Sequence, residues 1–287
     1  MSVSVWNDLS WVEGIRSPFL NIFFDTISLA GYPTFLILFI SFGYFYWSPA
    51  RFSRVAMMLF ISALINTFLK DFFQDPRPAI ELMLDPKVGT TYGWPSGHSQ
   101  IAVTLWGLLA YELKNKWITV GAISTIILIA FSRMYLGVHD FGDVFAGLLI
   151  GAIILYVWHY AVINNWYEKL TKKHWLFLII LFQLILYISY PSHEGHELSI
   201  WFLGVMTGWF VGSSNISLIS QPFKRFFLSI SATAIVFISL IYITQLEQGI
   251  QFKGLLGIIL SYLLGMIFSI LVTWLIPRLL RLMRLAS

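Results

Sequence analysis

The sequence is a series of long apolar segments joined by short links that carry most of its charge. The apolar segments cover residues 33–47, 54–73, 97–113, 117–136, 140–163, 174–190, 198–214, 224–244 and 254–276. Most are close to the roughly 20 residues that an α-helix needs to cross a bilayer. Only 11% of the residues are charged, against roughly a quarter in a soluble domain. We therefore predict an all-α, polytopic membrane helix bundle with about nine transmembrane helices.

The basic residues predict the orientation of these helices. Of the 18 lysine and arginine residues, 12 lie in every second link, beginning after the first span: Arg51, Arg54, Lys114, Lys116, Lys169, Lys172, Lys173, Lys224, Arg225, Arg278, Arg281 and Arg284. Cytoplasmic links are rich in such residues, so we expect the N-terminus outside and the C-terminus in the cytoplasm. Because the basic residues punctuate apolar runs instead of forming one patch, the net charge of +4 does not indicate a nucleic-acid partner.

Residues 19–30 precede the first span and have two distinct helical faces. Phe19, Ile22, Phe23, Ile27 and Ala30 share one face, and Asn21, Asp25 and Ser28 share the other. This spacing predicts a helix that lies in the membrane interface and ends at Gly31-Tyr32-Pro33. The alternative is that these residues are the start of the first span.

Two basic residues follow the second apolar segment at a spacing suited to one anion. Lys70 and Arg77 are seven positions apart across a helix end, and Pro76 and Pro78 restrict the backbone around Arg77. A planar guanidinium and a compact ammonium can converge on a tetrahedral phosphate. The alternative for Lys70, Arg77 and also Arg133 is an anchor that snorkels to the membrane surface.

The segment "YGWPSGHSQ", residues 92–100, opens the third apolar segment with the residues of an anion site. Ser96 is a typical N-cap residue, and Gly97 allows a ligand to approach the backbone closely. The free N–H groups of a helix N-terminus attract anions. His98 would then stand beside a bound phosphate, where it could protonate a leaving oxygen.

A third group of residues spans the link between the fourth and fifth apolar segments. Arg133 ends the fourth segment, His139 begins the fifth, and Asp143 follows four residues later. We expect His139 and Asp143 to share a helix face, so that the carboxylate orients the imidazole and leaves its other nitrogen free to attack phosphorus. The alternative is an ordinary contact at a helix end.

Together, Lys70-x6-Arg77-Pro78, Pro95-Ser96-Gly97-His98 and Ser132-Arg133-x5-His139-x3-Asp143 resemble the signature of the type 2 phosphatidic acid phosphatase (PAP2) superfamily, over roughly residues 55–163. The resemblance implies a phosphatase that acts through a phosphohistidine, without a metal or another cofactor. It implies that His139 is the nucleophile, Asp143 its orienting residue and His98 the general acid. Lys70, Arg77, Ser96, Gly97 and Arg133 would hold the phosphate.

The resemblance also sets the expected domains and substrates. We expect an N-terminal interfacial segment (1–32), a PAP2-type core (33–165) and a C-terminal extension of about four spans (166–287). Phosphatidic acid, phosphatidylglycerophosphate, polyprenyl pyrophosphates and sphingoid-base phosphates all fit a site at the membrane surface. The alternatives are a glucose-6-phosphatase-like sugar phosphatase and a non-catalytic lipid transporter or scramblase. We expect a bacterial cytoplasmic membrane with the site on the outer face, although an endoplasmic-reticulum enzyme with a lumenal site would share this topology; the oligomeric state stays open.

Two patterns outside the signature have simple interpretations. Glycines recur every fourth position at Gly147 and Gly151, and again at Gly204, Gly208 and Gly212. Such spacing favours close helix packing, with a dimer interface as the alternative. The stretch His193–Glu197 favours a polar loop over a metal site.

Overall fold

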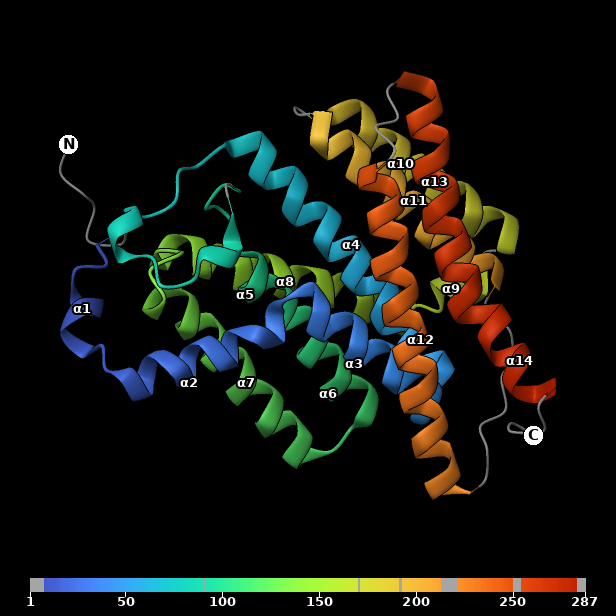
Figure 1. The fold of residues 1–287 in the computed structure, drawn as a ribbon, viewed down its shortest axis with the longest axis horizontal. Helices are drawn as coiled ribbons and strands as arrows, with labels where there is room; N and C mark the ends of the chain where they lie inside the picture. The colour runs from blue at the N-terminus through green and yellow to red at the C-terminus, as the bar shows by residue number, and fades with distance from the viewer. Residues whose placement is uncertain are drawn as a thin grey trace. The chain divides into compact units, whose positions relative to one another are not determined.

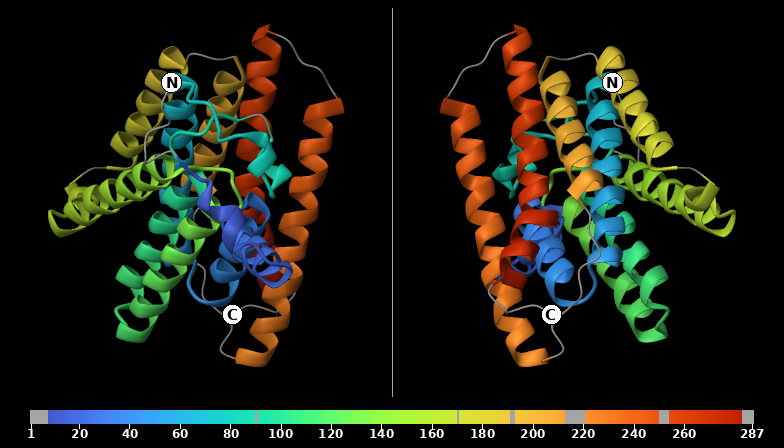
Figure 2. Two further views of the ribbon diagram at one scale, coloured as in Figure 1. Left: turned by 90° about the vertical axis from the view of Figure 1, so that its left-hand side faces the viewer. Right: turned by 90° about the vertical axis from the view of Figure 1, so that its right-hand side faces the viewer.

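The computed structural model describes residues 8–89, 91–169, 171–190, 193–212, 221–249 and 254–282, and within these ranges it has no strand (Figures 1 and 2). The α-helices are α1 (Trp11–Ile15), α2 (Pro18–Ser28), α3 (Pro33–Tyr46), α4 (Pro49–Phe73), α5 (Gly97–Ala102), α6 (Leu108–Leu113), α7 (Lys116–Tyr135), α8 (Phe141–Ile163), α9 (Trp166–Lys169), α10 (Lys172–Ser189), α11 (His193–Gly212), α12 (Pro222–Gly249), α13 (Gly254–Ile270) and α14 (Ile276–Leu282). Three short 3₁₀ turns are η1 (Leu29–Gly31), η2 (Ile80–Leu82) and η3 (Pro86–Val88), and two π-helical turns are η4 (Val103–Gly107) and η5 (Leu271–Leu275). The all-α prediction is confirmed.

Among the described residues, five helices are long and apolar enough to cross a membrane: Pro49–Phe73, Lys116–Tyr135, Phe141–Ile163, Pro222–Ile243 and Leu256–Leu280. Helices α2 and α3 make a sixth if they are taken as one span, although they are bent by 57° at their junction. The other predicted spans are helical but shorter: 97–113 is divided by a π turn, and α10 and α11 provide only short apolar stretches. The count of nine spans is therefore not confirmed.

The chain forms two compact units. Unit 1 comprises residues 1–36 and 61–167, and unit 2 comprises residues 37–60 and 168–287. Every residue of the three sequence motifs belongs to unit 1. The division predicted from the sequence, at 32/33 and 165/166, stays a prediction.

Glycines bring α8 against α5 in unit 1 and so position the site. A Cβ atom added to Gly147 would lie 3.1 Å from Cβ of Ser99 and 3.2 Å from the backbone nitrogen of Gln100. A Cβ atom on Gly151 would lie 2.7 Å from the carbonyl oxygen of Gln100. Only glycine permits this separation, which holds the N-terminus of α5 beside the first turn of α8.

A buried polar network fixes α5 against α4 on its other side. Asn66 of α4 donates to the carbonyl oxygen of Pro95 at 3.1 Å and to Oε1 of Gln100 at 2.9 Å. Gln100 in turn donates to the carbonyl oxygen of Ser62 at 2.8 Å. Each of these buried groups thus has a partner, as burial requires, and the start of α5 is held from two directions.

Helix α2 turns its polar face inward and its apolar face outward. Phe19 and Ile22 are 74% and 71% exposed, whereas Ser28 is fully buried. Phe24 packs against Tyr135 at the end of α7, with ring centroids 4.5 Å apart. The predicted helix with two faces is present and ends at the predicted Gly31-Tyr32-Pro33 break, and its polar face packs on the protein.

In unit 2, glycines pack α11 against α13. A Cβ atom on Gly204 would lie 3.0 Å from the nitrogen of Met266, and one on Gly208 would lie 3.0 Å from its Cα. Gly265 makes the reciprocal approach to α11. The predicted close packing is therefore confirmed, with a helix of the same chain as the partner. The backbone of His193–Glu197 is the start of α11 and not the predicted loop, and the side chains of this stretch lie outside the described residues.

Candidate active site

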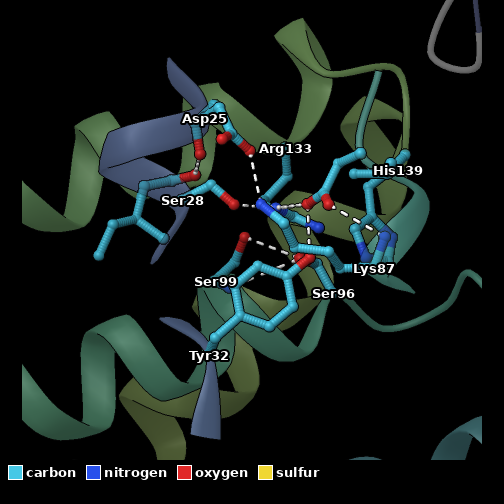
Figure 3. A network of polar contacts seen from close by, with 12 residues as sticks. Asp25, Ser28, Tyr32, Lys87, Ser96, Ser99, Arg133 and His139 are labelled. Carbon is cyan, nitrogen blue, oxygen red and sulfur yellow. Dashed lines mark hydrogen bonds and ion pairs between the residues drawn. The ribbon is translucent and has the colours of Figure 1, made fainter. Parts of the chain in front are cut away.

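Arg133 lies at the centre of the site with one side of its guanidinium group already bound. It occupies the last turn of α7 and is fully buried. Its Nη1 donates to Oγ of Ser28 and, at 3.0 Å, to Oδ2 of Asp85 (Figure 3). Its Nε and Nη2 are buried and have no partner among the described residues. These two N–H groups form one edge of the guanidinium, the geometry with which arginine binds a phosphate through two bonds.

His139 and Asp143 meet as predicted, but by a different local structure. Nδ1 of His139 lies 3.0 Å from Oδ2 of Asp143, and both side chains are buried. His139 precedes α8 and does not begin it, because Asp140 is the N-cap and exchanges capping-box hydrogen bonds with Asp143. The expectation of a shared helix face is thus wrong: a turn residue meets the third residue of the helix. The contact still orients the imidazole through Nδ1.

The sequence suggested that the second nitrogen of His139 is free, but in the structure this nitrogen contacts Arg77. Nη1 of Arg77 lies 3.3 Å from Nε2 of His139 and donates to the carbonyl oxygen of Val138 at 2.8 Å. The same guanidinium donates from Nε to the carbonyl oxygen of Thr91 at 2.6 Å. Lys70 donates to the carbonyl oxygens of Tyr92 and Gly93 of the same loop. A phosphate dianion is a stronger acceptor than these neutral carbonyls and would compete for both cations.

Ser96, Gly97 and His98 form the mouth of α5. Ser96 is the N-cap, as predicted, and its hydroxyl accepts from the backbone of Ser99 at 3.5 Å. A Cβ atom on Gly97 would lie 2.9 Å from Oδ1 of Asn66, so this backbone is held close to α4. His98 contacts the Tyr32 ring edge to face, with centroids 4.5 Å apart. Nε2 of His98 is buried without a hydrogen-bond partner in the described part of the chain.

Three contributors were not predicted from the sequence: Ser28, Tyr32 and Asp85. They reach Arg133 or His98 from α2, from the break before α3 and from the loop between α4 and α5. Only Asp85 carried a local signal, because an Asp before a proline often caps a short turn. It does cap η3, through Oδ1 and the backbone nitrogen of Lys87 at 3.2 Å. Nothing in that signal indicated its second contact, with Arg133.

The electrostatics favour an uncharged imidazole among cations. Burial and the positive charges of Lys70 and Arg77 hold the pKa of His139 well below its ordinary value. Burial, with repulsion from Arg133, lowers the pKa of Arg77 to about 10, so this residue remains charged at neutral pH. Burial raises the pKa of Asp85, but the hydrogen bond from Tyr32 and the charge of Arg133 more than offset it, and the pKa lies below the usual value. The site therefore combines a cluster of basic side chains with a neutral, oriented imidazole.

Comparison with known proteins finds relatives of the central region of the chain. Residues 51–167 match the sequence model of the PAP2 superfamily. The chain is 28% identical over 158 residues to phosphatidylglycerophosphatase B of Bacillus subtilis, covering 50% of this chain and 75% of that protein. It is 25% identical over 239 residues to a dihydrosphingosine 1-phosphate phosphatase of Schizosaccharomyces pombe, covering 74% of this chain and 58% of that protein.

One solved structure aligns with part of this chain. The crystal structure of a transmembrane PAP2-type phosphatidylglycerolphosphate phosphatase from Bacillus subtilis has a TM-score of 0.48 and 26% identity, covering 57% of this chain and 84% of that one.

Proposed function

We propose that the chain, whose residues 51–167 match the PAP2 superfamily model, is an integral membrane phosphatase of that superfamily that hydrolyses a lipid phosphate or pyrophosphate. The observation that carries the proposal is the His139–Asp143 pair, 3.0 Å apart, set among Lys70, Arg77 and Arg133. An oriented, neutral imidazole is a nucleophile, and three cations suit the charge of a transferring phosphoryl group.

The first step of the proposed reaction forms a phosphohistidine. Nε2 of His139 attacks phosphorus, and the bond from phosphorus to the leaving oxygen breaks. His98 donates a proton to that oxygen, which departs as an alcohol or, from a pyrophosphate, as a lipid phosphate. The contact between Nδ1 of His139 and Asp143 supports this direction of attack, because it commits the other nitrogen to the reaction.

The second step releases inorganic phosphate. His98, now unprotonated, takes a proton from water as the water oxygen attacks phosphorus, and the bond from phosphorus to His139 breaks. Both steps return every group to its starting state. We expect Nε and Nη2 of Arg133 to hold two phosphoryl oxygens, because these buried donors have no other partner among the described residues. Lys70, Arg77 and the backbone at Ser96 and Gly97 complete the anion site. We expect no metal or other cofactor in either step.

The relatives act on different phosphorylated lipids, and their names supply the candidate substrates. One is a phosphatidylglycerophosphatase and another a dihydrosphingosine 1-phosphate phosphatase. An amphiphile can leave its acyl chains in the bilayer while its headgroup reaches Arg77, which lies just after the membrane-length helix α4. Phosphatidic acid and polyprenyl pyrophosphates meet the same requirement.

The test is phosphate release by the purified chain from phosphatidic acid, phosphatidylglycerophosphate, a polyprenyl pyrophosphate, sphingosine 1-phosphate and glucose 6-phosphate. We expect turnover of at least one lipid and loss of turnover in His139→Ala, with unchanged elution on size exclusion. Preference for glucose 6-phosphate would favour a sugar phosphatase. No release from any substrate would favour a non-catalytic lipid transporter or scramblase.

We further propose that the site faces the outside of a bacterial cytoplasmic membrane and that the C-terminus faces the cytoplasm, on the distribution of basic residues. The chain contains no cysteine, so single cysteines report topology without background. In intact cells, a membrane-impermeant maleimide should label Glu81→Cys, in the loop beside the site, and spare Lys116→Cys, at the start of α7. The reverse pattern would place the site in the cytoplasm.

A further inference from the structure

Tyr32 and Asp85 connect the two halves of the site that the motifs leave separate. The hydroxyl of Tyr32 donates to Oδ2 of Asp85 at 2.5 Å, and the same oxygen accepts from Nη1 of Arg133 at 3.0 Å. The Tyr32 ring lies 4.5 Å from His98 and 5.8 Å from the guanidinium carbon of Arg133, measured from its centroid. One tyrosine thus contacts the proposed acid, the arginine proposed to bind phosphate and the carboxylate between them.

A buried carboxylate next to a phosphate site requires an explanation, because its charge repels the ligand. Asp85 and Arg133 are both fully buried, and removing charges from water costs several kcal/mol per ion. Asp85 receives two hydrogen bonds on Oδ2 and one from the Lys87 backbone on Oδ1. This hydrogen bonding fixes the carboxylate and, through it, the rotation of the guanidinium.

The direction in which Arg133 is held matters for its use. Asp85 and Ser28 take both contacts on Nη1, which directs the Nε–Nη2 edge away from them. Without Asp85 the guanidinium could turn Nη1 toward the ligand and lose the two-point geometry. Asp85 and Ser28 thus orient the guanidinium of Arg133 and leave its Nε–Nη2 edge available to a phosphate.

The backbone next to Tyr32 is shaped to receive His98. A Cβ atom on Gly31 would lie 2.7 Å from Cγ of His98 and closer still to its Cδ2. The glycine therefore leaves the space that the imidazole occupies, and Tyr32 closes it from the next position. Gly31 and Tyr32 lie between α2 and α3, where the chain bends by 57°.

We infer that Tyr32 and Asp85 are positioning residues that hold Arg133 and His98 in a common arrangement for phosphoryl transfer. The inference rests on the proposed phosphatase function and adds to it two residues outside the three motifs. It requires that their loss weaken transition-state binding more than substrate binding.

The experiment compares Asp85→Asn and Tyr32→Phe with Glu81→Gln, which removes an exposed carboxylate from the same loop. The measurements are kcat, KM and the inhibition constant of orthovanadate, a mimic of the transferring phosphoryl group. We expect kcat of Asp85→Asn to fall about 10- to 100-fold and vanadate inhibition to weaken by a similar factor, with KM changed less than about threefold. Tyr32→Phe should lose about tenfold in kcat, and Glu81→Gln should stay within about twofold.

Other outcomes separate the explanations. If the carboxylate acted only by repelling the substrate, Asp85→Asn would lower KM and keep kcat, which overturns the inference. A fall in kcat with unchanged vanadate inhibition indicates fewer folded molecules and also overturns it. If Asp85→Asn does not fold, Tyr32→Phe decides, because it removes one hydroxyl only.

The failure of the proposed function has a different signature. In that case the unmodified chain releases no phosphate from any lipid. The inference is then tested by vanadate binding alone, measured as a thermal shift of the unmodified chain and of Asp85→Asn, and equal shifts would overturn it.

Discussion

The two units bury different kinds of polar group. Among the described residues, the buried aspartate, histidine and arginine side chains are Asp85, Arg133, His139, Asp140 and Asp143, and all belong to unit 1. The buried side chains with polar groups that the structure describes in unit 2 are serines, threonines, Gln183, Tyr44, Tyr190 and Trp209, none of them a carboxylate, imidazole or cation. Because burying charge is expensive, its confinement to one unit among the described residues supports the proposed site in unit 1.

Both units nevertheless use the same packing device. Gly147 and Gly151 bring α8 onto α5, and Gly204 and Gly208 bring α11 onto α13. In unit 1 the approach ends at Ser96 and Asp143, where the backbone nitrogen of Ser96 donates to the carbonyl oxygen of Asp143 at 3.0 Å. Close helix approach thus ends beside buried charged side chains in unit 1, whereas in the described part of unit 2 it ends beside uncharged ones.

Removing a buried charge from unit 1 should have the largest effect. We expect Asp143→Asn to lower kcat about 10⁴-fold, because the amide no longer fixes the imidazole tautomer, as when the carboxylate of a catalytic triad is replaced. The assay is phosphate release, with Asp25→Asn, a half-exposed carboxylate paired with Lys87, as the matched control. Activity of Asp143→Asn within tenfold of the unmodified chain would contradict the assigned role.

Widening one glycine contact in each unit should separate chemistry from packing. Gly147→Leu pushes α5 from α8, and since a displacement of about 1 Å can cost about 100-fold in rate, we expect a loss of that size in kcat. Gly208→Leu makes the equivalent change between α11 and α13. It should lower stability by about 1–3 kcal/mol and leave kcat per folded molecule within about twofold.

The paired measurement is kcat normalised to the folded fraction, with the unfolding midpoint in detergent. Equal losses of normalised kcat in Gly147→Leu and Gly208→Leu would contradict the proposed division of labour between the units.

Acid should lower the stability of unit 1, which contains His139, and we expect this effect to be the smallest of those predicted. The pKa of folded His139 lies well below the ordinary 6.5, so as pH falls through that value the unfolded chain gains a proton and the folded chain does not. The contribution of His139 to the free energy of unfolding is nearly fully present above about pH 6.5. It falls by about 1 kcal/mol as the pH drops by one further unit. The check is the apparent unfolding midpoint from about pH 7.5 to about pH 5.5, with His139→Asn expected to flatten the slope. A midpoint that rises with acid would contradict the sign.

Much of the fold and the motif residues could be predicted from the sequence. Each predicted span begins or ends within a few residues of an observed helix, because apolar runs and proline breaks are local signals. The N-cap at Ser96 and the His139–Asp143 contact were likewise predicted from residues close together in the sequence, and both are present. The exact start of α8 was missed because the capping box of Asp140 and Asp143 was not recognised.

The contacts that could not be predicted are those between distant parts of the chain. Asp85 and Arg133 are 48 positions apart, and Ser28 and Arg133 are 105 apart. No periodicity encodes such a pairing. The orientation of α2 could not be predicted for another reason. The polar face of a helix usually faces water, whereas Ser28 on this face contacts the buried Arg133.

The outward apolar face of α2 has a consequence for how a lipid arrives. Phe19 and Ile22 lie on the surface of the chain, and Ser28 lies against Arg133 on the other side of the same helix. A helix with its side chains is about 10 Å across. For the proposed lipid phosphate substrate, the acyl chain and the phosphate would therefore be separated by the thickness of one helix, and the headgroup could enter sideways while the acyl chain stays in the membrane.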